Sequence, residues 1–404
     1  RQARPDLFAL HPMIDAPLIP QSRCLGLRGR LDARGQELEP IEDLPRWFAD
    51  NRAVLMAAEA IAVGLLHSPF NADHERAVAD FLRERLPGKP LSCSHELCAT
   101  PREYERFATA AANAYLQPLM SGYLAQLAEF CAESSLAVMG SDGALIAVEH
   151  AAKEPIQTVL SGPAGGLRGA WALAQGVDLD AVLALDIGGT STDVAALVGE
   201  PTASIGTQLA GLPLEVPLLP IETVGAGGGS IAWLDEAGLL RVGPQSAGAD
   251  PGPACYGRGG VAPTVTDAHV VLGRLDHLLG GEFPLDVPAA KRVVQCLADG
   301  LDSSLEATAQ AMIDLAEATM LRACKRVTAA RGIDPRGLPV VAYGGAGGLH
   351  ACAVAEAIGS DCVVFAQAPG TLSAEGILQA PPGRQSSRTL MLAQARWSAE
   401  QIEA

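Results

Sequence analysis

The stretch LDIGGTSTDV, from Leu185 to Val194, decides the fold of this 404-residue chain. Apolar residues 181–184 precede it, so the sequence predicts a buried strand that reaches Asp186 and enters a glycine turn. Gly188 and Gly189 allow a tight turn whose backbone N–H groups point at an anion. The turn also carries three hydroxyls and a second carboxylate, on Thr190, Ser191, Thr192 and Asp193.

A polar β-hairpin, in which Asp and Thr side chains only satisfy the turn, is the alternative interpretation of this stretch. The combination of strand, Asp, Gly-Gly-Thr, hydroxyls and second Asp favours a phosphate site. We predict that Asp186 holds Mg²⁺ through a bound water. Asp186, Thr190 and Asp193 are the predicted catalytic residues, and residues 188–192 are the predicted phosphate contacts.

A second glycine segment, YGGAGG from Tyr343 to Gly348, again joins a predicted strand to a predicted helix. Glycines lack Cβ, so adenine and ribose can lie against the backbone, and a helix N-terminus favours negative charge. Close packing at a strand-to-helix turn is the alternative. The predicted nucleotide contacts here are Gly344, Gly345, Ala346 and Gly347.

A third segment is GAGGGS, from Gly225 to Ser230. Three consecutive glycines cost conformational entropy, which indicates a backbone cradle over phosphates or substrate rather than a merely flexible loop. The predicted contacts are Gly227, Gly228 and Gly229. Asp267 and His269 are further candidates to line the site, with Thr266 or Asp267 as a helix N-cap as the alternative; His350 is expected to be satisfied or solvent-facing.

Two helices with small faces flank these segments. Gly165 and Gly169 lie four residues apart, and Ala351 and Ala355 repeat that spacing. Small faces allow helices to cross closely, so the pair is interpreted either as a hinge between lobes or as ordinary helix packing.

Strand–turn–helix units of this kind predict an α/β fold. A long helix is expected at 304–330, because its apolar residues repeat at spacings of three and four and Ser303 with Glu306 forms a capping box. Residues 46–88 are predicted to be helical, with an apolar run at 54–66 and a second helix near 75–86.

The formal net charge of −17 makes nucleic acid an unlikely partner, since an acidic surface repels phosphate backbones. No stretch of about 18 uncharged apolar residues is present, so no membrane span is expected. Nine scattered cysteines are typical of a reduced, cytoplasmic protein. Cys93, His95 and Cys98 have a spacing that permits a metal, but we interpret these cysteines as structural or incidental.

The order of the segments resembles the second half of the actin, sugar-kinase and heat-shock ATPase superfamily. In that pattern DIGGTSTD looks like the second phosphate segment, GGAG looks like the adenosine segment, and the small-faced helices look like the connecting hinge helices. The resemblance implies an actin-like, ribonuclease-H-like α/β ATPase fold with two lobes, of which the first is incomplete.

Within the superfamily the chain resembles the hydantoinase A / 5-oxoprolinase family over nearly its whole length. The segments that carry the resemblance are EYERFATAAANAYLQP from Glu103, LSGPAGGLRGA from Leu160, VGAGGGSIAWLD from Val224, VGPQSAGADPGPACYGRGG from Val242, PTVTDAHVVLGRL from Pro263, GGAGGLHA from Gly344 and LSAEGIL from Leu372, besides LDIGGTSTDVA.

This resemblance implies ATP-dependent hydrolysis of a cyclic amide of the hydantoin or 5-oxoproline type, with ATP and Mg²⁺ as cofactors and a hydantoinase B-type subunit or domain as partner. The alternatives are the ATP-handling subunit of a ketone carboxylase, a sugar or acid kinase, and a non-catalytic ATP-switched module. The implied domains are the remainder of an N-terminal hydantoinase/oxoprolinase domain at 1–100, a hydantoinase A-type ATPase domain at 101–379, and the start of a C-terminal segment at 380–404. We expect a further phosphate segment before Arg1 in a longer polypeptide.

Overall fold

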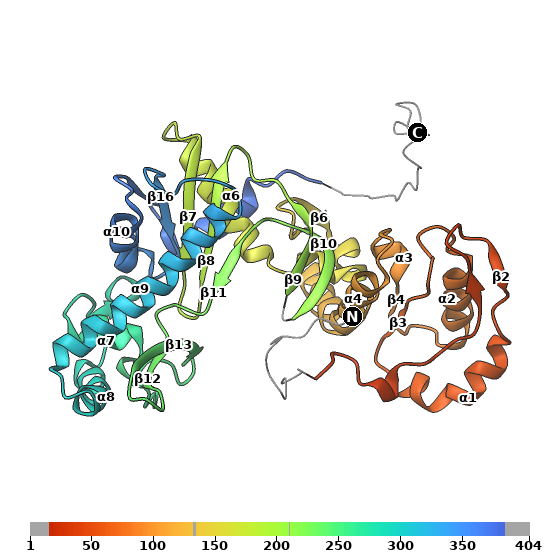
Figure 1. The fold of residues 1–404 in the computed structure, drawn as a ribbon, viewed down its shortest axis with the longest axis horizontal. Helices are drawn as coiled ribbons and strands as arrows, with labels where there is room; N and C mark the ends of the chain where they lie inside the picture. Colours follow the sequence, from red (N-terminus) through yellow and green to blue (C-terminus); the bar gives the residue numbers. More distant parts are fainter. Residues whose placement is uncertain (1–15, 132–134, 210, 384–404) are drawn as a thin grey trace. The chain divides into compact units, whose positions relative to one another are not determined.

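The computed structural model describes residues 16–131, 135–209 and 211–383, which divide into two compact units (Figure 1). Unit 1 comprises the chain up to residue 159, residues 204–218 and the residues from 382 on; unit 2 comprises 160–203 and 219–381. The sequence-based domain boundaries at 100 and 379 stay predictions, and most of the segment 380–404 lies outside the described residues.

Unit 1 is a collection of helices with small two-stranded sheets. Its helices are α1 (Leu44–Ala57), α2 (Asp73–Arg85), α3 (Ser94–Leu97), α4 (Glu103–Phe130) and α5 (Val148–Lys153), and its 3-10 turns are Gln21–Arg23 and Pro155–Thr158. Its strands pair as β1 (Arg30–Leu31) with β2 (Glu37–Glu39), β3 (Ile61–Val63) with β4 (Leu91–Cys93), β5 (Ala137–Met139) with β6 (Leu145–Ala147), and β9 (Ser204–Leu209) with β10 (Leu212–Leu218).

The predicted helical run at 54–66 is wrong in its second half. Helix α1 ends at Ala57, and Ile61–Val63 forms β3, which pairs in parallel with β4. The β-branched residues of this short run pack in the core of unit 1, with Val63 buried beside Leu82 of α2. A short apolar run has no periodicity that separates a buried strand from a helix, which explains the error.

Unit 2 is built around a five-stranded sheet with the strand order β11–β8–β7–β16–β17. Its strands are β7 (Ala181–Ile187), β8 (Thr192–Val198), β11 (Glu222–Val224), β16 (Val340–Tyr343) and β17 (Val363–Phe365). Strands β16 and β17 run parallel to β7, whereas β8 is antiparallel to both β7 and β11. This confirms the predicted α/β class and the predicted buried strand before Gly188.

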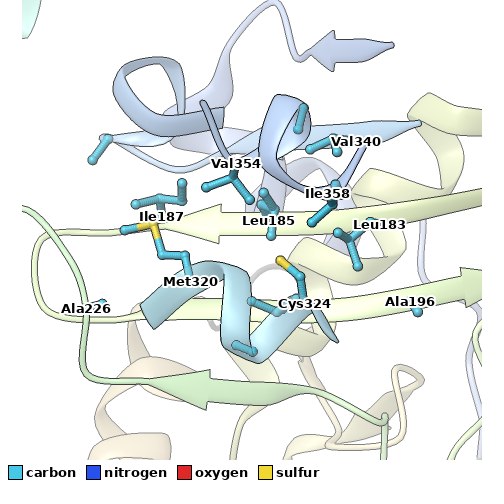
Figure 2. Packing of buried hydrophobic residues seen from close by; sticks show 14 residues of the cluster. Leu183, Leu185, Ile187, Ala196, Ala226, Met320, Cys324, Val340, Val354 and Ile358 are labelled. Atoms are coloured by element: carbon cyan, nitrogen blue, oxygen red, sulfur yellow. The ribbon is translucent and has the colours of Figure 1, made fainter. Parts of the chain in front are cut away.

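Alternate residues of β7 face opposite layers of helices. Leu183, Leu185 and Ile187 are fully buried against α9 (Leu305–Ala329) and α10 (Gly347–Ile358). Figure 2 shows this cluster, with Met320 and Cys324 of α9 on one side of the strand residues and Val354 and Ile358 of α10 close by. Each such large apolar side chain stabilises the fold by about 1.5–3 kcal/mol. The other face of β7, which carries Asp186, lies toward α6 (Ser161–Gln175).

Helix α9 begins one residue later than predicted. Its N-cap is Ser304, whose hydroxyl accepts a hydrogen bond from the Ala307 N–H at 3.2 Å, so the predicted capping box of Ser303 and Glu306 is wrong. The first half of α9 packs with α7 (Val265–Val271), α8 (Val287–Gly300) and the hairpin of β12 (Ser230–Leu234) and β13 (Leu240–Ser246) in a second core. The remaining small elements of unit 2 are the β14–β15 pair (His277–Leu278, Phe283–Pro284) and the 3-10 turns Ala254–Tyr256, Leu279–Gly281 and Pro369–Thr371.

The small face of α6 packs on α11 (Leu372–Leu378), and not on the alanines of α10. A Cβ at Gly376 would collide with the carbonyl oxygen of Gly165, and a Cβ at Gly169 would lie 2.9 Å from Leu372 Cγ. The two helix backbones therefore touch, which places α11 over the Asp186 face of the sheet. None of the described helices is long and apolar enough to cross a membrane.

Candidate functional site

The predicted phosphate turn forms the tip of the β7–β8 hairpin. The Gly188 N–H donates to the Ser191 carbonyl at 3.0 Å and closes a turn in which Gly189 and Thr190 are exposed. Thr192 is fully buried, and its hydroxyl donates to the Ala226 carbonyl at 2.5 Å. The tip therefore presents exposed backbone to a ligand, while Thr192 fixes the neighbouring loop.

The loop of Gly227, Gly228 and Gly229 lies directly on that tip. The Gly228 N–H donates to the Gly188 carbonyl at 3.1 Å, and the Gly229 N–H donates to the Gly189 carbonyl at 2.5 Å. A Cβ at Gly227 would lie only 2.7 Å from the Gly188 oxygen. Glycine is required here by close backbone packing, and this contact brings the first and third predicted segments together.

The Gly344–Gly347 turn meets the same hairpin from the β16 side. Gly344 has a positive φ of 79°, and a Cβ there would collide with the Asp186 carboxylate. The Ala346 N–H donates to the Ile187 carbonyl at 2.8 Å. Gly345 is exposed, whereas Ala346 and Gly347 are buried. The Gly188–Gly189 turn and the Gly344–Gly347 turn therefore lie side by side, and their role as nucleotide contacts stays a prediction.

A row of polar side chains crosses four strands beside these turns. The register pairs Thr223 with Asp193, Asp193 with Asp186, and Asp186 with Tyr343, so all four share the face that looks toward α6. The Thr223 hydroxyl donates to Asp193 Oδ1 at 2.5 Å. The Ser373 hydroxyl, on α11, lies close enough to Asp186 to lower its pKa.

The two carboxylates of this row are electrostatically unfavourable. Burial and the charge of Asp193 together raise the pKa of Asp186 to about 6, against the opposing effect of the Ser373 hydroxyl. Burial likewise raises the pKa of Asp193, although Thr223 lowers it. No cationic side chain in the described ranges pairs with either carboxylate. The pair therefore favours an external cation.

These donors fit Mg²⁺ bound together with a phosphate. Magnesium prefers oxygen ligands and is usually held by one or two carboxylates plus substrate phosphates, rather than by an all-protein cage. The described residues contain no cluster of three or more metal-ligating side chains. Asp186 and Asp193 lie beside exposed glycine backbone, so they could hold Mg²⁺ together with the phosphates of a bound ligand.

Sequence reasoning missed Tyr343, Ser373 and Thr223. The buried Tyr343 ring lies under α6, where a Cβ at Gly166 would stand 3.0 Å from its hydroxyl oxygen. Burial, with the charges of Asp186 and Asp193, raises the pKa of this hydroxyl. Tyr343 is the first residue of the second glycine segment, and its place beside Asp186 follows only from the pairing of β16 with β7.

The structure shows what surrounds Asp267, the Cys93–Cys98 group and His350. Helix α7 is capped by Thr264, and not by Thr266 or Asp267, because the Thr264 hydroxyl oxygen accepts from the Asp267 N–H at 3.3 Å. In return the buried Asp267 carboxylate accepts from the Thr264 N–H at 2.9 Å, and it also accepts from the Cys255 N–H at 2.8 Å. Cys93 and Cys98 are buried in unit 1, and burial raises the pKa of each thiol to about 12.

His350 is buried and contacts His269, so the expectation of a satisfied histidine holds and a solvent-facing one is excluded.

Comparisons with known proteins show to which proteins this chain is similar. The hydantoinase/oxoprolinase family matches residues 106–385, and the hydantoinase/oxoprolinase N-terminal region matches residues 1–86. The chain is 35% identical to the caprolactamase alpha subunit of Pseudomonas jessenii over 89% of this chain and 53% of the relative. It is 34% identical to 5-oxoprolinase 1 of Arabidopsis thaliana over 78% of this chain and 26% of the relative.

Two solved structures share the fold. Nucleotide-free acetone carboxylase, studied for ATP-dependent acetone carboxylation, superimposes with a TM-score of 0.80 at 31% identity, over 91% of this chain and 54% of that one. The ATP-dependent caprolactamase of Pseudomonas jessenii superimposes with a TM-score of 0.75 at 34% identity, over 87% and 52%. The chain spans about half the length of these relatives.

Proposed function

Because the chain belongs to the hydantoinase/oxoprolinase family, we propose that it carries the ATP site of an enzyme that hydrolyses a cyclic amide. The observation that carries this proposal is the Asp186–Asp193 pair, which lies where three glycine segments converge and has no cationic side chain beside it among the described residues. Relatives named caprolactamase and 5-oxoprolinase support a lactam as substrate, since both names denote enzymes that act on cyclic amides.

An unactivated lactam needs ATP because its carbonyl is a poor electrophile. In the proposed reaction the amide oxygen attacks the γ-phosphorus of ATP and ADP leaves. Water then adds to the phosphorylated imidate carbon, and the ring C–N bond breaks with the nitrogen leaving as the protonated amine. A second water hydrolyses the resulting acyl phosphate to the carboxylate and free phosphate. Catalysis of the phosphoryl transfer rests mainly on positioning and charge neutralisation.

Each segment has a part in this proposal. Gly188, Gly189, Thr190 and Ser191 lie along the phosphates, and the loop of 227–229 supports them. Thr192, predicted as a further phosphate contact, is fully buried and instead fixes the neighbouring loop through Ala226. Residues 344–347 contact adenosine. Asp186 holds Mg²⁺ through a bound water and Asp193 adds the second carboxylate; Mg²⁺ would neutralise the phosphate charge. In the actin-like fold that we propose, the five-stranded sheet of unit 2 is the core of the second lobe.

A ketone carboxylase is the second candidate, favoured by the match to acetone carboxylase over 91% of this chain. Phosphorylation would then activate a ketone enolate instead of an amide oxygen. In either case we propose a second subunit of hydantoinase B type, because one relative is named as a subunit of a larger caprolactamase. Complete lactam turnover by the isolated chain would contradict this division.

The test is release of phosphate from Mg²⁺–ATP by the full chain with its co-purifying subunit, against a panel of lactams and ketones. We expect free phosphate and ring-opened product in equal amounts, and only when a lactam is present. Ketone-dependent release would favour the carboxylase, and a stoichiometric phosphorylated product would indicate a kinase. Nucleotide binding without any substrate-dependent release would indicate an ATP-switched module.

A matched pair of variants assigns the activity to the site. Asp186→Asn should abolish phosphate release, whereas Asp334→Asn, which changes an exposed carboxylate of unit 2 paired with Arg336, should leave it unchanged. Full activity in Asp186→Asn would show that Asp186 does not take part in catalysis and only stabilises the turn.

A further inference from the structure

Unit 2 buries two imidazoles side by side, and the proposed chemistry uses neither. His269 of α7 and His350 of α10 are both fully buried, and their Nε2 atoms lie 3.3 Å apart. Their rings meet edge to face, with centroids 4.7 Å apart. On its other side, His350 Nδ1 lies 3.1 Å from Glu317 Oε1 of α9. The three side chains form a line that joins three helices.

The chemistry of the groups fixes the direction of the hydrogen bonds. An ionised Glu317 only accepts, so His350 carries its proton on Nδ1 and its Nε2 is an acceptor. His269 must then donate from Nε2, which leaves its Nδ1 as a buried acceptor without a partner among the described residues. Burial, with His350 and Arg274 nearby, lowers the pKa of His269 to about 3, in agreement with a neutral ring.

Each histidine stands one helical turn from a contact to the glycine segments. Thr266, three residues before His269, donates to the Gly228 carbonyl from both its N–H, at 2.7 Å, and its hydroxyl, at 2.8 Å. Ala346, four residues before His350, donates to Ile187 at 2.8 Å. The histidine pair therefore joins the helix that holds the 227–229 loop to the helix that follows the 344–347 turn.

We propose that His269 and His350 are positioning residues, whose hydrogen bond holds the 227–229 loop and the 344–347 turn at the separation that an adenine nucleotide requires. This inference rests on the proposed function. Two apolar side chains in place of the histidines would fill the same space and would bury fewer polar atoms. A hydrogen bond between the two rings also fixes the distance and the direction between α7 and α10. The histidines act through Thr266 and Ala346, so neither has to touch the nucleotide.

Two substitutions of His269 separate the hydrogen bond from mere packing. In His269→Gln the amide nitrogen can take the place of Nε2 and donate to His350, whereas the shorter side chain in His269→Asn cannot reach. We expect Asn to weaken Mg²⁺–ADP binding by the full chain about tenfold, the size of one lost hydrogen bond, and Gln to stay within about twofold. Calorimetric titration measures both values, and circular dichroism verifies folding. The control His277→Asn, which changes an exposed histidine of unit 2, should bind like the parent.

The protonation pattern gives an independent readout. In ¹⁵N spectra of histidine-labelled chain, His269 should be the Nε2–H tautomer and His350 the Nδ1–H tautomer, and His269 should remain neutral at pH 5. Equal affinities of the Asn and Gln variants, or the opposite tautomers, would overturn the positioning role while the nucleotide site stands. A parent chain that binds no nucleotide would overturn the proposed function, and this inference with it.

Discussion

Two carboxylates, the fully buried Glu75 in unit 1 and the half-buried Asp186 in unit 2, have opposite surroundings. Burial raises the pKa of Glu75, but hydrogen bonds from His95, Ser94 and backbone N–H groups outweigh it, so the net pKa is lowered. The fully buried Arg106 also lies 3.3 Å from Glu75. Asp186 instead faces a second carboxylate and one hydroxyl, and its pKa is raised to about 6.

This difference separates a structural charge from a candidate functional one. Glu75 has its cation and its donors within the fold, and nothing remains for a ligand to supply. Asp186 and Asp193 lack a cation within the described chain, so their charge is an energetic cost that bound Mg²⁺ would relieve. Half-buried carboxylates with raised pKa values and no partner of opposite charge are candidates for function.

The largest expected effect on stability comes from removing the charge of Glu75, whose cation and hydrogen-bond donors lie within unit 1. Glu75→Gln leaves the Arg106 guanidinium buried without its counter-charge, which should lower the free energy of unfolding by about 3–5 kcal/mol. Chemical denaturation measures the loss. Asp334→Asn removes an exposed ion pair and should leave the denaturation midpoint unchanged. Equal effects of the two substitutions would contradict the role assigned to burial.

The second largest effect is expected from disrupting the contact between α6 and α11, which places Ser373 near Asp186. Gly376→Ala places a methyl group against the Gly165 backbone and should destabilise unit 2 by about 3 kcal/mol, since the two helix backbones cannot separate without disturbing α11. Gly122→Ala is the matched control, because a Cβ there meets nothing within 4 Å and α4 should gain slightly in helix propensity. A thermal midpoint for Gly376→Ala at or above the parent value would show that α6 and α11 do not pack as described.

Asp186→Asn should stabilise the apo protein while removing its activity. A carboxyl group with a raised pKa binds its proton more tightly in the folded state, so stability falls as pH rises from about 4 to about 6 and stays lower above that range. Asparagine removes this cost and should add about 2 kcal/mol at pH 7.5 and little below pH 4. Urea denaturation at both pH values measures the difference. A loss of stability at pH 7.5 would mean that Asp186 already has a compensating partner.

The smallest effect sharpens the assignment of Ser373. Its hydroxyl lowers the pKa of Asp186, so Ser373→Ala should raise that pKa and destabilise the chain by about 1 kcal/mol above pH 6. In the Asp186→Asn background the same substitution should cost less. A double-mutant cycle followed by denaturation tests this, and strict additivity would show that the two side chains do not interact.

The sequence was informative wherever local pattern determines structure. The apolar run before Asp186 predicted β7, and apolar spacings of three and four predicted α9. The second and third glycine segments were recognisable because their runs of glycine stand out in the sequence. The structure shows the reason for these runs: close packing leaves no room for a Cβ at Gly227 or Gly344.

The remaining site residues depend on register and helix packing. Thr223 and Tyr343 join the carboxylate row only through strand pairing, and Ser373 arrives through the contact between α6 and α11. None of these relations has a signature along the chain. The Ser303 cap was misplaced by one residue because Ser303 and Ser304 are equally good N-caps in sequence.

Hydrogen–deuterium exchange of the full chain, with and without saturating Mg²⁺–ADP, tests the central claim most directly. We expect slower exchange in peptides that cover residues 186–193, 225–230 and 344–348, no change in the Glu75 region, and loss of the protection in Asp186→Asn. Protection confined to other segments, or protection that survives unchanged in Asp186→Asn, would contradict a nucleotide site at the convergence of the three glycine segments.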